Sequence, residues 1–184
     1  MGRLHYATIC SLDGYIADAD GEFRWAEPDP EVHAFLNEKE RPVGTYLYGR
    51  RTFDTMAVWQ TLGGPDLSAV ENDYAEIWRA ADKVVWSTTL ESVSTPRTRL
   101  ERSFDAETVR RLKAESAGDL GVGGAGLAAQ LLAAGLVDDV HLYLHPVVIG
   151  GGTRTLPDGV RLDLELVDER RFASGVVYLH HRVR

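Results

Sequence analysis

The sequence predicts a single α/β domain over residues 1–184, with a mostly parallel mixed sheet that ends in a C-terminal antiparallel hairpin. Three observations support this prediction. Strand-like and helix-like segments alternate along most of the chain, a short turn at 173–175 joins the last two strand-like segments, and no linker or repeat divides the chain. A chain of 184 residues, 44% of them hydrophobic, can bury one sizeable core.

The elements follow from the spacing of apolar residues and from turn signals. Pro30 marks the first turn of one helix, Asp105 is the N-cap candidate of another, and Gly135 stops a third. Helices are predicted at residues 29–40, 50–59, 73–80, 105–115 and 125–135. Strands are predicted at residues 3–12, 44–49, 82–90, 119–122, 138–149, 161–172 and 176–184.

Charge and cysteine content exclude several classes of function. A formal net charge of −8 argues against nucleic-acid binding and against anionic membrane surfaces. Cys10 is the only cysteine, so an internal disulfide is impossible and a cytoplasmic location is expected. No apolar run is long enough for a signal peptide or a membrane span.

His141 and His145 lie on a predicted strand about 13 Å apart, so no metal site is expected, and both should be half-exposed.

Residues 121–126, GVGGAG, match the pattern G-x-G-x-x-G that cradles dinucleotide phosphates. A Rossmann fingerprint also needs a full apolar strand before the first glycine and an acidic residue about 20 positions later, at the end of the next strand. Neither is present. The glycines still predict close approach of a phosphate to the backbone at Gly123 and Gly124, with free N–H groups in a helix that begins near Gly126. Tight packing of helix on sheet is the alternative. Replacing Gly124 with valine should block a phosphate and leave the fold intact.

Two further predicted strands end in groups that suit a phosphate. Arg50 and Thr52 follow one strand, and Ser87 and Thr88 lie at the end of another. Because the carboxyl ends of parallel strands line a shared crevice, these residues are expected to meet the glycine turn. No acidic residue is expected beside Arg50 or Ser87, which favours a ligand with a phosphate over one with a bare ribose.

These segments together carry a resemblance to a known family. The segments are SLDGYIA at 11–17, GRRTF at 49–53, VVWSTT at 84–89, the stretch 121–152 and the terminal hairpin. The chain resembles the dihydrofolate-reductase-like superfamily, most closely the reductase domain of bifunctional riboflavin-biosynthesis enzymes and its free-standing bacterial relatives. The resemblance implies a three-layer sandwich with helices on both faces of the sheet.

The resemblance also implies an NADPH-dependent reductase acting on a C=N or C=O bond of a small pterin- or pyrimidine-like heterocycle. Asp13 and Glu31 are the candidate catalytic residues, and Asp29 is an alternative to Glu31. Glu31 or Asp29 could instead be simply an acid at a helix N-terminus, where the helix dipole favours a negative charge. The residues implied to hold the cofactor are Ala7, Ile16, Ala17, Gly49, Arg50, Thr52, Ser87, Thr88, Gly123, Gly124, Gly126 and Leu127.

Two alternative functions remain open, and the sequence also leads to an expectation about the oligomeric state. The chain could catalyse the riboflavin-pathway reduction of 5-amino-6-(5-phosphoribosylamino)uracil, without the deaminase step because the zinc motifs are absent. It could instead be a nucleotide-binding or sensor protein without turnover. The apolar strand VHLYLHPVVIG at 140–150 and the resemblance lead us to expect a homodimer.

Overall fold

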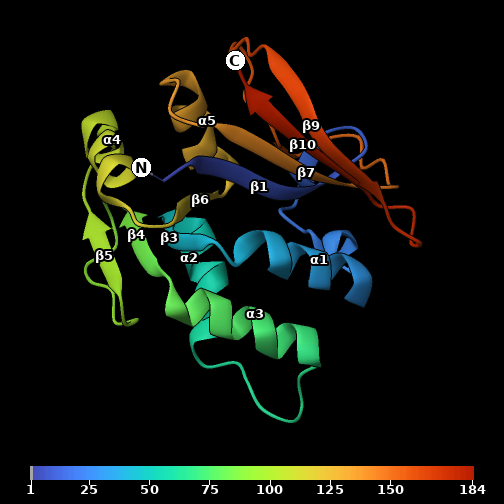
Figure 1. Ribbon diagram of the computed structural model, residues 1–184, viewed down its shortest axis with the longest axis horizontal. Coiled ribbons are helices and arrows are strands. Elements are labelled where there is room, and N and C mark those ends of the chain that lie inside the picture. Colours follow the sequence, from blue (N-terminus) through green and yellow to red (C-terminus); the bar gives the residue numbers. More distant parts are fainter. Residues whose placement is uncertain (1) are drawn as a thin grey trace.

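The computed structural model describes residues 2–184 as a large twisted sheet flanked by helices (Figure 1). The sheet has eight strands in the order β5-β4-β3-β6-β1-β7-β10-β9. From β5 to β7 every neighbouring pair is parallel, whereas β10 runs antiparallel to β7 and to β9. The strands are β1 (Leu4–Ser11), β3 (Val43–Gly49), β4 (Asp82–Trp86), β5 (Thr98–Glu101), β6 (Asp119–Gly123), β7 (Asp139–His145), β9 (Leu164–Arg171) and β10 (Val177–Val183).

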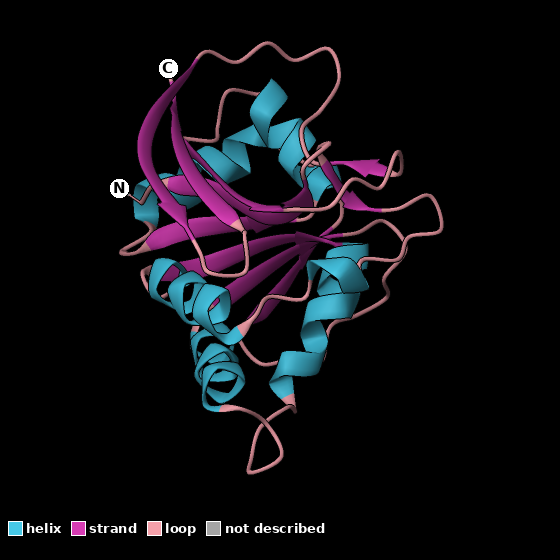
Figure 2. Cartoon of the chain, turned by 90° about the vertical axis from the view of Figure 1, so that its right-hand side faces the viewer, coloured by secondary structure: helices cyan, strands magenta, loops and turns pink. Residues whose placement is uncertain are grey.

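Helices cover both faces, so the molecule has the three layers that the resemblance implies (Figure 2). One face carries α1 (Pro30–Glu40), α2 (Arg50–Met56) and α3 (Ala69–Ala80), and the other carries α4 (Ala106–Glu115) and α5 (Ala125–Ala133). Short 3₁₀ turns lie at η1 (Arg24–Ala26) and η2 (Ala57–Gln60). A separate two-stranded ribbon pairs β2 (Tyr15–Ala17) with β8 (Thr153–Arg154).

The alternation of side chains along β1 divides the core between the two faces of the sheet. Leu4 and Tyr6 are fully buried in the cluster beneath α4 and α5, together with Leu131 of α5. On the opposite face Ile9 packs against a second cluster that includes Val32 of α1. A strand buried on both sides must be central, and β1 lies between β6 and β7.

Three helices begin at the side-chain caps that their sequences contain. Asp29 accepts hydrogen bonds from two backbone N–H groups at the start of α1, and Asp105 does the same for α4. Ser68 and Glu71 form a reciprocal capping box at the start of α3. The helix predicted over 73–80 therefore begins four residues earlier than expected, because the capping box starts α3 at Ala69.

Several strand predictions need correction. The strand predicted over 138–149 ends as β7 at His145, followed by Pro146, which has no N–H to continue a ladder. The strand predicted over 82–90 ends at Trp86, before the hydroxyl residues. Strands β2, β5 and β8 were not predicted. They are only two to four residues long, and β5 and β8 are polar as well, so none of them has a strong apolar pattern.

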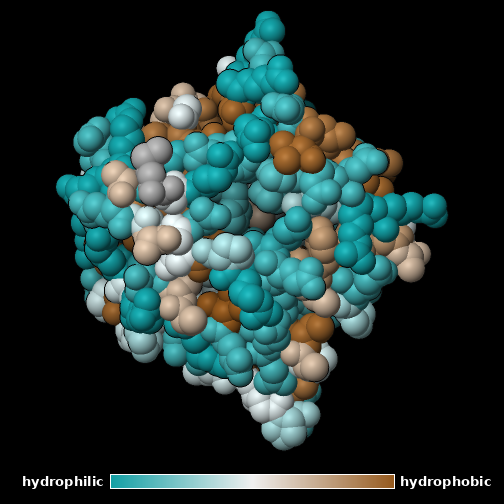
Figure 3. Space-filling view, viewed as in Figure 1, coloured by the Kyte–Doolittle hydropathy of each residue, from teal (hydrophilic) through white to brown (hydrophobic). Residues whose placement is uncertain are grey.

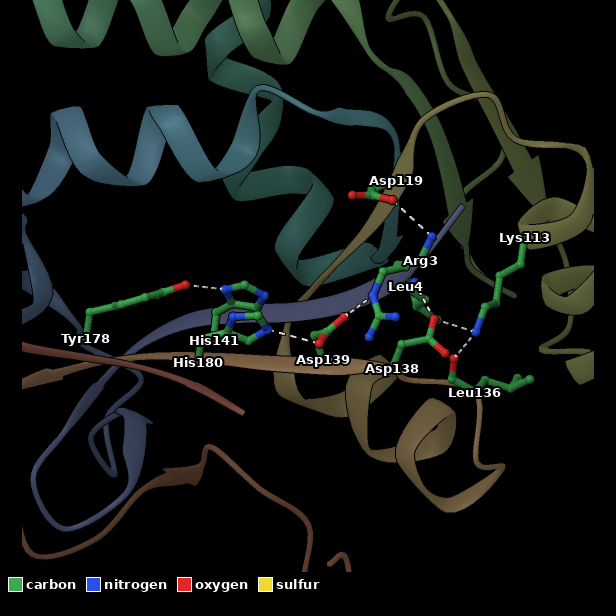
Figure 4. A network of polar contacts seen from close by, with 10 residues as sticks. All are labelled: Arg3, Leu4, Lys113, Asp119, Leu136, Asp138, Asp139, His141, Tyr178 and His180. Atoms are coloured by element: carbon green, nitrogen blue, oxygen red, sulfur yellow. Dashed lines mark hydrogen bonds and ion pairs between the residues drawn. The ribbon is translucent and has the colours of Figure 1, made fainter. Parts of the chain in front are cut away.

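A polar network fixes the amino ends of the central strands (Figure 4). Asp139 accepts a hydrogen bond from Arg3 Nε at 2.6 Å and lies 2.9 Å from His180 Nε2. Burial acts to raise the pKa of Asp139, but Arg3 and His180 together hold it below its ordinary value. Lys113 pairs with Asp138 at 2.6 Å. This network lies at the end of the sheet opposite to the expected ligand crevice, which indicates a role in strand registry.

Within residues 2–184, no helix has the length and apolar character needed to cross a bilayer. The same part of the chain contains no group of three His, Cys, Asp or Glu side chains placed to hold a metal ion.

Candidate functional site

The residues expected to bind a ligand lie along one row, at the carboxyl ends of the parallel strands. Gly49 is opposite Trp86 across the β3–β4 ladder, and Tyr48 is opposite Gly123 across the β3–β6 ladder. The helix after β6 covers one face of the sheet, whereas the helices after β3 and β1 cover the other. This reversal is the topological switch at which open α/β sheets bind ligands.

Arg50 is the first residue of α2 and reaches across to the end of β4. Its Nη1 donates to Thr89 Oγ1 at 2.7 Å, so the guanidinium adjoins the hydroxyl-rich segment after Trp86. The expectation that no acid stands beside Arg50 was wrong, because Asp54 lies one helical turn later with Oδ2 3.5 Å from Arg50 Nε. Thr89 was missed because sequence offers no way to choose among three consecutive hydroxyls.

Ser87 and Thr88 differ in their surroundings. Ser87 is buried, and its Oγ accepts from the backbone N–H groups of Thr89 and Leu90 at 3.3 and 2.9 Å. Ser87 Oγ also lies 3.5 Å from Thr89 Oγ1, so its hydroxyl hydrogen can be directed to Thr89 or to a ligand. Thr88 is exposed beside it.

The glycine turn between β6 and α5 packs directly on Thr52. Gly124 has a φ of +91°, and a Cβ at this position would collide with Thr52 Oγ1. The expectation that valine at Gly124 would leave the fold intact was therefore wrong, because the turn needs both the positive φ and the absent side chain. Gly126, by contrast, is exposed, and a Cβ there would meet nothing within 4 Å.

The N-terminus of α5 has no side-chain cap. Gly124 is the N-cap residue, and the first turn contains no acidic side chain. The first N–H groups of the helix are therefore without side-chain partners from the cap, which leaves the positive end of the helix dipole open above Gly126. Leu127 is buried in the core beneath this turn, so its side chain supports the turn and only its backbone can meet a ligand.

The loop after β1 is held against the segment that follows β7. The Asp13 carboxylate accepts from the N–H groups of Ile149 and Gly150 at 3.2 and 2.7 Å. The Ser11 hydroxyl and these two N–H groups lower the pKa of Asp13. Asp13 therefore anchors the loop at its base, and it also lines a second pocket together with Cys10 and Arg154.

The expected nicotinamide neighbours lie on and beside this anchored loop. Ile16 and Ala17 belong to β2, which the short ribbon with β8 fixes in place. Ala7 lies half-buried on β1 in register with His141 of β7. The structure thus brings these residues to the β1 end of the row, while Arg50 and Ser87 lie at the other end.

The two acids at the start of α1 point to different environments. Glu31 pairs with Arg170 of β9 at 3.1 Å and accepts from the N–H of Ala173, so it braces the outside of the hairpin. Asp29 instead lines a pocket of about 250 Å³ at the carboxyl end of β7. Of the two alternatives left open by the sequence, Asp29 is the acid that faces a cavity.

Sequence reasoning missed two other residues of this pocket. His145 is 7% exposed rather than half-exposed, because η1 and the β9–β10 turn close over the end of β7. Trp25 of η1 stands edge-on to it, with ring centroids 6.4 Å apart. His145 Nε2 and Trp25 Nε1 are both buried without a hydrogen-bond partner among residues 2–184. Such unpaired atoms are costly unless something binds them.

A family model described as the RibD C-terminal domain matches residues 3–178. The chain belongs to this family. The Bacillus subtilis (strain 168) protein named "Uncharacterized protein YyaP" is 32% identical over 174 residues, which cover 92% of this chain and 88% of that relative. The resemblance to the reductase domain of riboflavin-biosynthesis enzymes is thus confirmed at the level of the family.

Solved structures agree with this membership at the level of fold. A putative riboflavin biosynthesis protein from Shewanella sp. PV-4 superposes with a TM-score of 0.76 at 20% identity, covering 100% of this chain and 99% of that one. A deaminase/5-amino-6-(5-phosphoribosylamino)uracil reductase from Thermotoga maritima gives 0.70 at 17% identity, and this chain spans 57% of it. Dihydrofolate reductase from Enterococcus faecalis, complexed with NADP(H), gives 0.67 at 15% identity, with 99% and 96% covered. The fold is dihydrofolate-reductase-like.

Proposed function

We propose that this protein is a reductase that binds NADPH along the carboxyl ends of β4, β3, β6 and β1 and reduces a small heterocycle held beside β7. The observation that carries the proposal is the juxtaposition of Arg50, Thr52 and the uncapped start of α5 on one row. From β4 to β7 this row covers four inter-strand spacings, about 19 Å, which suits an extended dinucleotide. Membership of the RibD C-terminal domain family supports the same reading.

The groups along the row fit the cofactor's phosphates. A guanidinium and a hydroxyl suit a 2′-phosphate, because an Arg fork gives two charge-assisted hydrogen bonds. Arg50 and Ser87 supply these groups at the β4 end. Free helix N–H groups suit a pyrophosphate, and Gly126 leaves the approach to them clear of side chains.

The protein's contribution to the reaction is positioning. When bound, the reduced nicotinamide supplies a hydride that forms a C–H bond as the C=N or C=O π bond breaks, and a proton from water completes an N–H or O–H group. Asp13 keeps the loop carrying Ile16 and Ala17 against the β1 end of the row, which would fix the distance from nicotinamide to pocket.

Calorimetric titration with NADPH and NADH tests the cofactor, and NADPH oxidation with a panel of pterins and pyrimidines tests turnover. We expect tighter binding of NADPH and oxidation with at least one heterocycle. Tight binding with no turnover on any compound would instead favour a nucleotide sensor. Turnover confined to the phosphoribosylamino-uracil would assign the riboflavin-pathway step. Absence of binding of either cofactor would refute the proposal.

We also propose a homodimer formed through the hairpin end of the sheet. Leu164, Leu166 and Val167 are exposed on β9, the last strand of the sheet. Figure 3 shows apolar residues gathered over the region where Figure 1 places β9 and β10. Light scattering should give about twice the chain mass of 20.3 kDa, and Leu166→Lys should give monomers. A monomeric wild type would contradict the dimer.

A further inference from the structure

The turn that follows β4 is fastened at both of its ends to the end of the edge strand β5. At its start, the backbone N–H of Ser87 donates to the carbonyl oxygen of Glu101 at 2.9 Å. At its far end, the carbonyl oxygens of Leu90 and Glu91 accept from Nη1 and Nη2 of Arg102, the second at 2.9 Å. The last residue of β5 and the residue after it therefore hold the whole turn in place.

The guanidinium of Arg102 suits this role because of its shape and its charge. Its planar fork presents N–H groups in a fixed geometry, so it holds two neighbouring carbonyl oxygens at one spacing. Hydrogen bonds from a charged donor are also stronger than those between neutral groups. Arg99 lies three residues earlier, on β5, and its Nε pairs with the carboxylate of Glu101 at 3.1 Å. The turn is thus held by Arg102, whereas Arg99 forms an ion pair within its own strand.

The turn held in this way presents a hydroxyl group to Arg50. Inside the turn, Ser87 Oγ accepts from the backbone N–H groups of Thr89 and Leu90 at 3.3 and 2.9 Å. The hydroxyl of Thr89 then accepts from Arg50 Nη1 at 2.7 Å. Thr89 directly precedes the residue whose carbonyl oxygen Arg102 binds. The position of the Thr89 hydroxyl beside Arg50 therefore depends on a turn that Arg102 anchors.

We infer that Arg102 is a positioning residue that sets the preference for a cofactor with a 2′-phosphate by aligning Thr89 with Arg50. The inference rests on the proposed function, because it takes this end of the row as the 2′-phosphate site. Arg102 acts through the turn, because its two terminal nitrogens donate to the backbone of that turn. Misalignment penalises only a ligand that carries the 2′-phosphate, because hydrogen bonds to that group weaken steeply with distance and angle.

Calorimetric titrations with NADPH and NADH test the inference, because the two cofactors differ only in the 2′-phosphate. We expect Arg102→Ala to weaken the binding of NADPH by about fivefold or more and that of NADH by less than about twofold. Arg102→Lys keeps the charge without the fork and should fall between Arg102→Ala and the wild type. Arg99→Ala is the matched control, because it removes the same charge from an exposed position on β5 and should leave both affinities unchanged.

A double-mutant cycle separates positioning from direct contact with the phosphate. If Arg102 acts through Thr89, the change Arg102→Ala should cost little further affinity for NADPH in a Thr89→Val background, so the two effects should not add. Additive effects would show that Arg102 reaches the phosphate by itself and would overturn the positioning role. Circular dichroism of each variant checks the fold, and Arg102→Lys carries the same comparison should Arg102→Ala fail to fold.

The outcomes also distinguish this inference from the proposed function. If the wild type binds NADPH more tightly than NADH and Arg102→Ala leaves that ratio unchanged, the positioning role fails and the cofactor site stands. If the wild type binds neither cofactor, or binds both equally well, the proposed 2′-phosphate site fails, and the role of Arg102 fails with it.

Discussion

Replacing Gly126 with alanine should stabilise the protein and weaken cofactor binding at the same time. Gly126 lies in the first turn of α5, is exposed, and has open space where a Cβ would stand. Alanine in a helix is more stable than glycine by roughly 0.5–1 kcal/mol, and no clash offsets that gain here. The added methyl group would stand over the N–H groups that we propose bind the pyrophosphate.

The expected loss of affinity follows from those N–H groups. A hydrogen bond to a charged group contributes about 1.5–3 kcal/mol, so displacing the phosphate from one of them should weaken NADPH by roughly tenfold to a hundredfold. Thermal unfolding of the cofactor-free protein and calorimetric titration with NADPH measure the two effects separately.

Gly63→Ala serves as the control for the general effect of adding a methyl group. Gly63 lies in the loop between α2 and α3, where a Cβ would make ordinary contact at 3.8 Å with Asn72. The Gly63→Ala protein should bind NADPH with the affinity of the wild type. A Gly126→Ala protein that is more stable than the wild type yet binds NADPH equally well would refute the phosphate site at α5.

Three other predictions use the same measurements. Arg50→Ala should reduce the preference for NADPH over NADH by about 1–2 kcal/mol, discounted because the side chain is 49% exposed, whereas Asp54→Asn should increase it; an unchanged ratio in both would contradict the 2′-phosphate role. Gly124→Ala should lower the free energy of unfolding by at least about 1–2 kcal/mol, because it forces a left-handed φ and a clash with Thr52; wild-type stability would refute this. Burial and the neighbouring His5 and His180 lower the pKa of His141 to about 3 in the folded protein. Between this value and the ordinary histidine pKa of about 6.5, the unfolded chain binds a proton at His141 and the folded chain does not. The contribution of His141 to the free energy of unfolding is therefore fully present above about pH 6.5. It falls by up to about 1.4 kcal/mol per pH unit as the pH decreases towards 3. Urea unfolding at several pH values should show a shallower slope for His141→Gln, and equal slopes would count against this account.

The sequence by itself determined the fold class and one end of the functional row. Local signals sufficed there, because the caps at Asp29 and Asp105, the apolar alternation of β1 and the glycines before α5 act within a few residues. The same local reading placed Arg50 and Ser87 at strand ends. Since parallel strands share a carboxyl edge, proximity of these groups could be inferred without knowing the strand order.

Only the tertiary structure decided which polar groups are paired and which face a cavity. Glu31 and Asp29 are two residues apart on one helix start, yet one braces the hairpin and the other lines the pocket. Trp25 comes to lie edge-on to His145 across more than 100 residues of chain. The spacing of residues along a strand or helix fixes local direction, but burial and pairing depend on segments that only the packed sheet brings together.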